Sequence, residues 1–170
     1  MKHICYLFLA SLLSISLFAS GYKTTGKSVR IKRVFFKNFR IYQINHWIDK
    51  DFNYAKPKEL IFANVNKYFT LKMLRTLKAQ RILKPSIEVY ESNNFHDRKT
   101  IRKAFKHITG ELKKGEKLQI YYNAKNTSTT FSFRGKKSVI YGKKFMQATW
   151  ACWFANTPQP SMRRQLSALR

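Results

Sequence analysis

The sequence is poor in acidic residues and in cysteine. Only 8 of its 170 residues are Asp or Glu, against 34 Lys and Arg, which gives a formal net charge of +26. So few carboxylates leave no obvious pair for acid–base catalysis by two neighbouring carboxyl groups. Of the two cysteines, Cys5 lies among the first 21 residues, so a chain without that segment keeps Cys152 alone and cannot form an internal disulfide. Its stability must then come from packing.

Metal-binding patterns are also missing from the sequence. Beyond residue 21 the histidines are His46, His96 and His107, and none has a partner at the spacing that metal ligands require. No second long apolar run follows the first one. We therefore expect no metal, no cofactor and no further membrane segment after the N-terminal region.

The first 21 residues predict a secretory signal peptide. Lys2 precedes an apolar run over 4–18, and small residues follow it. That run is shorter than the roughly 20 apolar residues that a bilayer-spanning helix needs. We expect cleavage near Ala19 or Gly21, export to the periplasm or the medium, and one domain over 22–170. An uncleaved membrane anchor is the alternative.

The first half of this domain predicts strands followed by helices. Residues 29–48 and 67–74 are rich in β-branched and aromatic side chains, which favours strands, the first segment forming two strands joined by a tight bend. Residues 75–93 have apolar side chains at helical spacing, and Pro85 should kink or restart that helix. An aspartate can cap a second helix over about 97–108.

The second half predicts a three-stranded antiparallel meander and a buried helix. Short strands over 117–124, 129–133 and 138–141 are separated by polar turns. Residues 142–155 are apolar around most of a helical circumference, which indicates a helix buried against the sheet. Cys152 in this helix is expected to be a small buried hydrophobe. A tail that contains prolines follows.

Several segments resemble the chalcone isomerase-like domain of bacterial exported proteins. The similar segments are 129–136, 140–145 and 150–162, and upstream 35–37 and 71–75 with Asn93. Together they span nearly the whole chain after residue 21. The resemblance implies an α+β fold, an open-faced β-sandwich in which a curved antiparallel sheet packs against helices. It also implies a cleft between sheet and helices that can take a flat apolar ligand.

The resemblance further implies a site on the first strands. In plant members a strand arginine and a hydroxyl-bearing strand residue isomerise a chalcone, or the arginine meets the carboxylate of a fatty acid. Arg30 is the best match for the arginine, and Phe39 is placed where the enzymes carry the hydroxyl. Phe39 cannot donate a hydrogen bond to a substrate oxygen, which argues against isomerase chemistry.

We therefore expect a small apolar or amphipathic anion to bind in the cleft, with its head at Arg30. Five aromatic side chains are expected to line the cleft: Phe35, Phe39, Phe69, Phe131 and Phe133. The alternative is that these aromatics only form the core, as aromatic residues on alternating strand positions usually do.

Two other function classes stay open. The net charge favours an anionic membrane surface or another polyanion as partner. The basic residues are spread along the whole chain and no nucleic-acid-binding motif accompanies them, which argues against specific nucleic-acid binding. An isomerase-type enzyme is the second alternative, but we assign no catalytic residue. The hydroxyls available to it, none in a recognisable catalytic spacing, are Tyr121, Tyr122, Tyr141 and Thr149.

Overall fold

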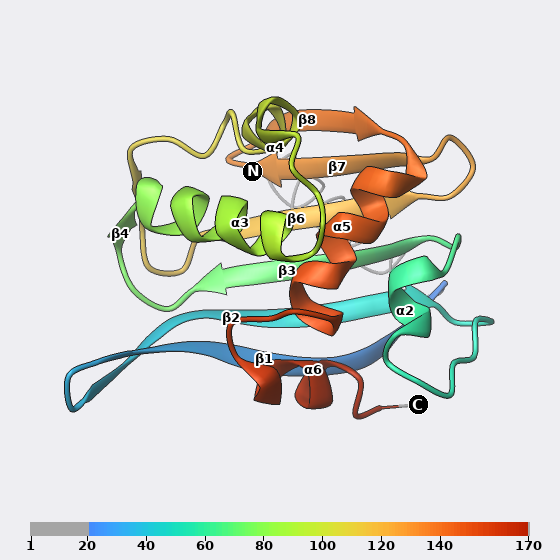
Figure 1. Cartoon of the computed structure of the whole chain (residues 1–170), viewed down its shortest axis with the longest axis horizontal. Coiled ribbons are helices and arrows are strands. Elements are labelled where there is room, and N and C mark those ends of the chain that lie inside the picture. Colours follow the sequence, from blue (N-terminus) through green and yellow to red (C-terminus); the bar gives the residue numbers. More distant parts are fainter. Residues whose placement is uncertain (1–20, 170) are drawn as a thin grey trace, which may run out of the picture.

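The computed structural model of the chain describes residues 21–169. Within them a curved antiparallel sheet of six strands has the order β1-β2-β3-β6-β7-β8, and the helices cover one of its faces (Figure 1). The strands are β1 (Tyr22–Val34), β2 (Lys37–Asp49), β3 (Lys67–Met73), β6 (Lys117–Asn123), β7 (Ser128–Phe133) and β8 (Lys136–Tyr141). A short ribbon pairs β4 (Leu77–Lys78) with β5 (Glu111–Leu112).

The helices are α2 (Glu59–Phe62), α3 (Gln80–Ser92), α4 (Arg98–Ala104), α5 (Lys143–Phe154) and α6 (Pro160–Leu166). None of those in the described part of the chain has the length and hydrophobicity to cross a membrane. The predicted α+β order of strand hairpin, strand, two helices, meander and buried helix is confirmed. The predicted signal peptide lies outside the described residues, apart from its last residue.

β1 and β2 form the hairpin predicted for 29–48, and each strand has 13 residues. Val34 pairs with Lys37, so the turn consists of two residues, Phe35 and Phe36. This hairpin extends beyond the other strands at one end of the molecule (Figure 1).

A β-bulge interrupts the hairpin close to its middle. Arg30 pairs with Tyr42, whereas the next residue, Ile31, pairs with Arg40. Ile41 is therefore an extra residue on β2. A bulge of this kind changes which side chains of a strand share a face, because it breaks the regular alternation.

Helix α3 runs without interruption across Pro85, so the predicted restart at this proline is wrong. Pro85 has no amide hydrogen to donate to the carbonyl of Arg81. Both residues are exposed, so water can bind that carbonyl and the helix continues. The helix begins at Gln80, later than predicted, because the residues before it form the short strand β4.

Helix α4 has the predicted N-terminal cap. The Asp97 carboxylate accepts a hydrogen bond from the backbone amide of Thr100 at 3.0 Å and another from its hydroxyl at 2.6 Å. The helix ends at Ala104, before the predicted end near Ile108. Ile108 is nevertheless buried, because a turn returns the chain to the core.

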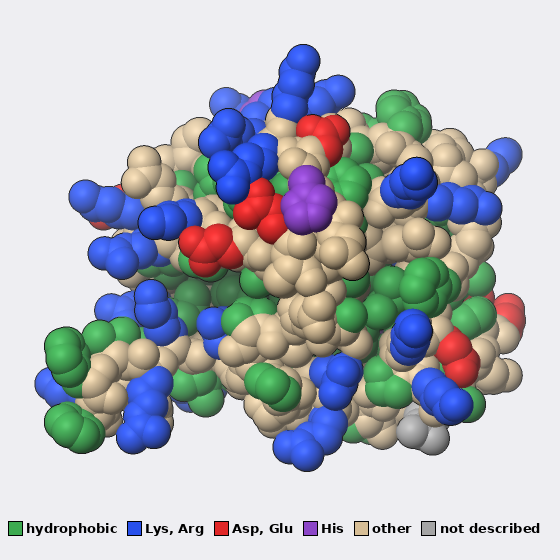
Figure 2. Space-filling view, in the orientation of Figure 1, with side chains coloured by type: hydrophobic (Ala, Val, Ile, Leu, Met, Phe, Trp, Pro, Cys, Tyr) green, Lys and Arg blue, Asp and Glu red, His purple; other side chains and the backbone are tan. Residues whose placement is uncertain are grey.

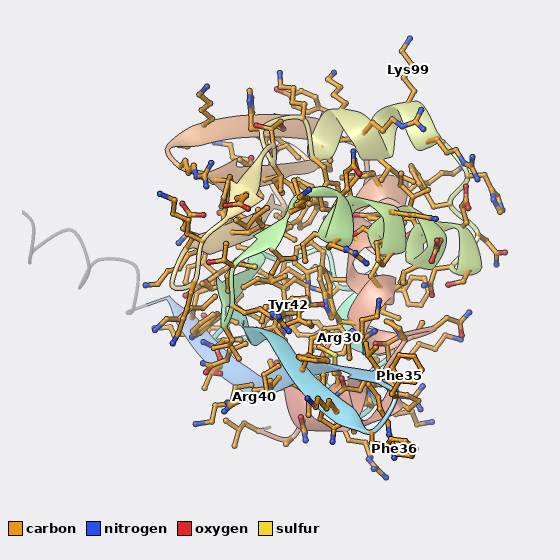
Figure 3. The ribbon with its side chains drawn as sticks, turned by 90° about the vertical axis from the view of Figure 1, so that its left-hand side faces the viewer. Arg30, Phe35, Phe36, Arg40, Tyr42 and Lys99 are labelled. Carbon is orange, nitrogen blue, oxygen red and sulfur yellow. The ribbon has the colours of Figure 1, made fainter. Side chains whose placement is uncertain are left out.

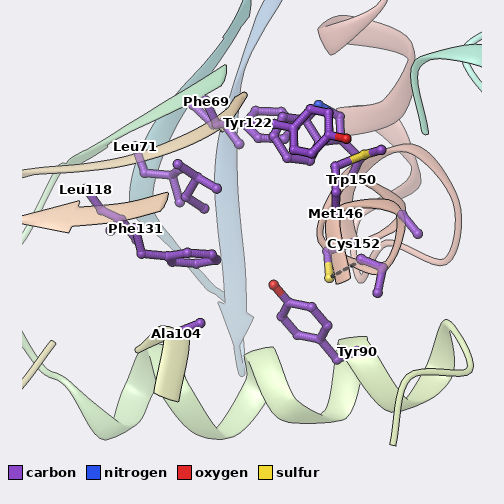
Figure 4. Close-up of a cluster of buried hydrophobic side chains, with 14 of the residues drawn as sticks. Phe69, Leu71, Tyr90, Ala104, Leu118, Tyr122, Phe131, Met146, Trp150 and Cys152 are labelled. Atoms are coloured by element: carbon purple, nitrogen blue, oxygen red, sulfur yellow. Dashed lines mark hydrogen bonds between the residues drawn. The ribbon is translucent and has the colours of Figure 1, made fainter. Parts of the chain in front are cut away.

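The core lies between the sheet and α5 (Figure 4). Trp150 is fully buried, and its ring centroid is 5.1 Å from that of Phe69 and 6.2 Å from that of Tyr122. The Cys152 thiol is buried as predicted and donates to the carbonyl of Ala148. Strands β3 and β6 place alternate side chains in this core, as expected for a sheet with one covered face.

A chain of hydrogen bonds crosses the core from α5 to α6. Trp150 Nε1 donates to His46 Nε2 at 2.9 Å, so the other ring nitrogen of a neutral His46 carries the hydrogen. His46 Nδ1 then donates to Thr25 Oγ1 at 2.7 Å, and Thr25 donates to the carbonyl of Leu166 at 2.6 Å. Each hydrogen in this chain has an acceptor. Burial lowers the pKa of His46 well below its usual value, and the charge of nearby Lys67 lowers it further.

Lys67 is a fully buried amine in the same region. Its amino group donates to the carbonyls of Leu60 at 2.7 Å and Ile61 at 3.4 Å in α2. It also lies 4.8 Å from the centre of the Trp150 ring. Burial lowers the pKa of Lys67 to about 7. Lys67 thus satisfies carbonyls that the short helix α2 leaves without partners.

Helix α6, which the sequence did not predict, packs against β1. A Cβ atom at Gly26 would lie only 2.1 Å from the carbonyl oxygen of Gln165, so only glycine permits this close approach. Beside it, Ser28 donates to the Gln165 side chain at 2.6 Å. Met162 and Leu166 are fully buried in this contact. Pro160 suits the first helical position because its fixed φ matches the helix and its missing amide hydrogen is not needed there.

Candidate functional site

A cavity of about 700 Å³ lies between α3 and the sheet, on the side of the β1–β2 hairpin. Its walls come from β1, β2, β3 and β6, from α3, and from the end of α5 with the segment that follows it. Figure 2 shows its opening as a hollow between the hairpin and α3, with apolar side chains inside and basic ones around the rim.

The deep end of the cavity is apolar. Strands contribute Leu71, Leu118 and Ile120, and α3 contributes Ile82 and Tyr90, all of which are buried. The Tyr90 hydroxyl is 2.8 Å from Thr149 Oγ1, which itself donates to the Phe145 carbonyl, so the Tyr90 hydrogen is already used. The deep end therefore suits a hydrocarbon group.

The rim of the cavity is strongly basic. Five basic side chains line it: Arg30, Lys32, Arg75, Lys78 and Arg81. Among the described residues of the cavity wall, Glu88 is the one carboxylate. The two ion pairs within residues 21–169 join Arg98 to Glu91 and Arg134 to Glu116. The cations of the rim are thus not neutralised by carboxylates of this chain, and they favour an anionic ligand.

Arg30 is half-buried and held in place by the segment after α5. Its Nη1 atom donates to the carbonyl of Ile31 at 3.0 Å and to Gln159 Oε1 at 3.4 Å. Gln159 in turn bonds the backbone of β1 on both sides of Arg30, accepting from Ile31 N at 2.8 Å and donating to Val29 O at 3.1 Å. This arrangement positions the guanidinium and leaves several of its donors free for an anion.

Tyr42 lies directly across from Arg30 in the β1–β2 pairing, and both side chains line the cavity (Figure 3). Cross-strand partners have Cβ atoms about 4.5–5.5 Å apart and side chains on one face. Trp153 Nε1 donates to the Tyr42 hydroxyl at 3.4 Å, and within the described residues that hydroxyl has no acceptor for its own hydrogen. Burial raises the pKa of Tyr42, which keeps the hydroxyl protonated as a donor.

Phe39 does not lie directly opposite Arg30 in the hairpin. Phe39 pairs with Lys32, lines the rim of the cavity, and has the Arg75 guanidinium 4.7 Å above its ring. Because Ile41 is inserted in the bulge, Tyr42 and Phe39 face the same cavity although they are three residues apart. A hydroxyl donor is therefore present beside the arginine.

The other four predicted phenylalanines lie outside the cavity wall. Phe69 is fully buried in the core against Trp150, and Phe131 and Phe133 of β7 are buried in the same core. Phe35 is at the tip of the hairpin and is 89 % exposed. Among the predicted site residues, the structure thus brings together Arg30 and Phe39, and adds Tyr42.

The candidate hydroxyls of the enzyme alternative also lie outside the cavity wall. Tyr122 donates to Asn64 Oδ1 at 2.7 Å, Thr149 donates to a carbonyl of its own helix, and Tyr141 is 72 % exposed. Tyr121 is half-buried on the other side of the sheet, 3.4 Å from the Tyr22 hydroxyl. None of them lies beside Arg30.

Comparison with solved structures identifies the architecture. The chain superposes on a fatty-acid binding protein of Arabidopsis thaliana with a TM-score of 0.67, at 10 % sequence identity, over 87 % of each chain. The fold is that of the chalcone isomerase-like proteins. At this level of identity the likeness establishes the fold alone. No protein-family model matches the sequence, and no curated protein matches it either.

Proposed function

We propose that this protein binds an amphipathic anion of the fatty-acid type, with the head group at Arg30 and Tyr42 and the chain in the apolar cavity. The observation that carries the proposal is the pairing of a guanidinium without a carboxylate partner and a hydroxyl with a free hydrogen at the mouth of that cavity. A volume of about 700 Å³ is typical of small-molecule sites. The fold it shares with a fatty-acid binding protein supports the same ligand class.

The composition of the cavity favours binding over acid–base catalysis. Among the described residues that line it there is no histidine, and Glu88 lies exposed at the rim. A general acid or base must be within reach of the reacting atoms and titrate near the working pH. Tyr42 has a raised pKa and acts as a hydrogen-bond donor, not as a base.

Replacing Arg30 with alanine should weaken the binding of a long-chain fatty acid by at least about tenfold, because a charge-assisted hydrogen bond contributes about 1.5–3 kcal/mol. Titration of a fluorescent fatty acid at low and high salt measures this. The matched control is Arg33→Ala, an exposed arginine of the same strand outside the cavity wall, which should leave the affinity unchanged.

Tyr42→Phe removes only the hydroxyl and should weaken binding by a smaller factor, about three- to tenfold, at either salt concentration. Binding that vanishes with salt and responds equally to Arg30→Ala and Arg33→Ala would instead indicate attraction to the surface charge. That result would contradict the cavity proposal.

We also propose that the protein is exported. The charged start, the short apolar run and the small residues that follow support cleavage of the first 19 to 21 residues. The mature protein would keep nearly all of its positive charge, because Lys2 is the one basic residue other than His3 that would be lost. Mass spectrometry of the intact protein from its natural host should give a chain that begins near Ser20 or Tyr22. A mass that includes Met1 to Ala19 would exclude cleavage.

A further inference from the structure

The tip of the β1–β2 hairpin exposes two aromatic side chains. Phe35 is 89 % exposed and Phe36 is 94 % exposed, and Ile31 and Val34 behind them are each 39 % exposed. Figure 3 shows both phenylalanines at the far end of the hairpin, away from the core. Neither ring is buried against the rest of residues 21–169.

The turn conformation adds to this observation. Phe35 has a φ of +51°, a left-handed conformation that bulky residues adopt at a cost and that Gly or Asn adopts readily. Two-residue hairpin turns therefore favour Gly, Asn or Asp at this position. The fold alone does not account for phenylalanine here, and departures of this kind are concentrated at functional sites.

Basic residues surround the two aromatic rings. Lys32, Arg33, Lys37 and Arg40 flank the tip, all four are exposed, and no acidic residue occurs between Tyr22 and Ile48. Figure 2 shows the tip as an apolar knob with basic side chains beside it. Apolar rings at the end of a protrusion, with cations set behind them, match an anionic bilayer: the rings reach the acyl boundary while the cations meet the phosphates.

We propose that the hairpin tip, formed by Phe35 and Phe36, inserts into the surface of an anionic phospholipid membrane. The same hairpin supplies Arg30, Lys32, Val34 and Phe39 to the wall of the cavity. Insertion of the tip therefore holds the basic rim of the cavity against the membrane. If the cavity binds a fatty acid as proposed above, the ligand can pass between bilayer and cavity there. The membrane contact itself does not depend on that ligand.

The test compares wild-type protein with the double variant Phe35→Asn, Phe36→Ser in a vesicle sedimentation assay. Asn adopts positive φ more readily than Phe, so the turn is retained. The vesicles contain equal parts of phosphatidylcholine and phosphatidylglycerol, with pure phosphatidylcholine for comparison. The double variant should bind the anionic vesicles at least about tenfold more weakly, because two ring burials are lost. The control Phe62→Ser changes a phenylalanine of α2 that is 54 % exposed and should bind like the wild type.

Insertion can be observed directly as well. A Phe36→Trp variant should gain fluorescence that lipids with brominated chains quench, whereas a Phe62→Trp variant should gain fluorescence that they do not quench. Equal binding by wild type and double variant, abolished by salt in both, would overturn the proposal and leave only diffuse charge attraction.

Fatty-acid binding measured without vesicles separates this proposal from the function of the cavity. The double variant should keep the affinity of the wild type there, since Phe35 and Phe36 are not part of the cavity wall. Lost fatty-acid binding by Arg30→Ala with unchanged vesicle binding, and the reverse pattern in the double variant, would show two separate sites. Loss of both properties in the double variant would contradict the assignment of the tip as a membrane contact alone.

Discussion

Gly26→Ala should lower the free energy of unfolding by about 3 kcal/mol, which is the upper range for an overpacked core position. The added methyl group would lie 2.1 Å from the carbonyl oxygen of Gln165 and 2.8 Å from the carbonyl carbon of Leu166. Both atoms belong to the backbone, so no side chain can move aside. The variant must displace α6 from β1 and expose Met162 and Leu166, which are fully buried. Urea denaturation followed by circular dichroism measures the effect.

Gly21→Ala is the matched control, made like Gly26→Ala in a chain expressed to begin before residue 21, because a Cβ atom there has nothing within 4 Å. Its free energy of unfolding should equal that of the wild type within about 0.5 kcal/mol. A Gly26→Ala protein as stable as the wild type would show that α6 does not pack against β1 as described. Because Gln159 precedes α6 and holds Arg30, the Gly26→Ala variant should also bind a fatty acid more weakly.

Acidification below pH 6.5 should destabilise the protein through His46. The pKa of His46 is well below 6.5 in the folded state, whereas an unfolded histidine titrates near 6.5. Below pH 6.5 the unfolded chain therefore binds a proton that the folded chain does not, and stability falls as the pH falls. The slope is up to about 1.4 kcal/mol per pH unit for one proton. The physical reason is that a proton on His46 Nε2 would face the Trp150 N–H, which is a donor only.

Free energies of unfolding between pH 6.5 and about pH 5 measure this slope, above the range where carboxylates titrate. Lys67, with a pKa of about 7 in the folded state, adds a smaller slope of the same sign near pH 6.5 and almost none below about pH 6, where it is protonated in both states. His46→Gln should be less stable near neutral pH and should have a flatter pH dependence. His96→Gln, at an exposed position, should keep the slope of the wild type. An unchanged slope in His46→Gln would contradict the assignment.

The membrane contact and the acid sensitivity involve different parts of the fold. His46 lies in the core beneath α5, whereas Phe35 and Phe36 lie at the far end of the hairpin. Variants at these two places should therefore act independently, which is usual for sites that share no contacts. The membrane-contact variants should therefore keep the pH dependence of stability of the wild type, and His46→Gln should keep its vesicle binding.

Much of the fold was predictable from local sequence pattern. Residues 117–141 gave the meander because β-branched and aromatic runs alternate with polar turns, and 142–155 gave a buried helix because it is apolar all round. The Asp97 cap was found because its chemistry is local. Helix α6 was missed because its stability depends on packing against β1 through Gly26, a residue more than 130 positions earlier.

The site was predicted only in part, and the reason is the bulge in β2. Counting back from a turn at Phe35 and Phe36 with regular pairing places Ile41 opposite Arg30. The inserted residue moves Tyr42 there instead, onto the cavity-facing side of the hairpin that Arg30 and Phe39 share. Nothing local in 37–49 marks the bulge, because every residue around it is an ordinary strand residue.

By itself the sequence determined the charge and the strand and helix types, since these depend on composition and on periodicity over a few residues. Arg30 was singled out by the resemblance to the chalcone isomerase-like family and not by these patterns. Only the tertiary structure decided which aromatic residues form the core, which hydroxyl faces Arg30 and which rings remain exposed. Phe69 is buried, Phe39 lines the cavity and Phe35 is exposed, although all three are phenylalanines in or beside strands. Their roles differ because strand register and helix packing, set by contacts distant in the sequence, fix what each side chain touches.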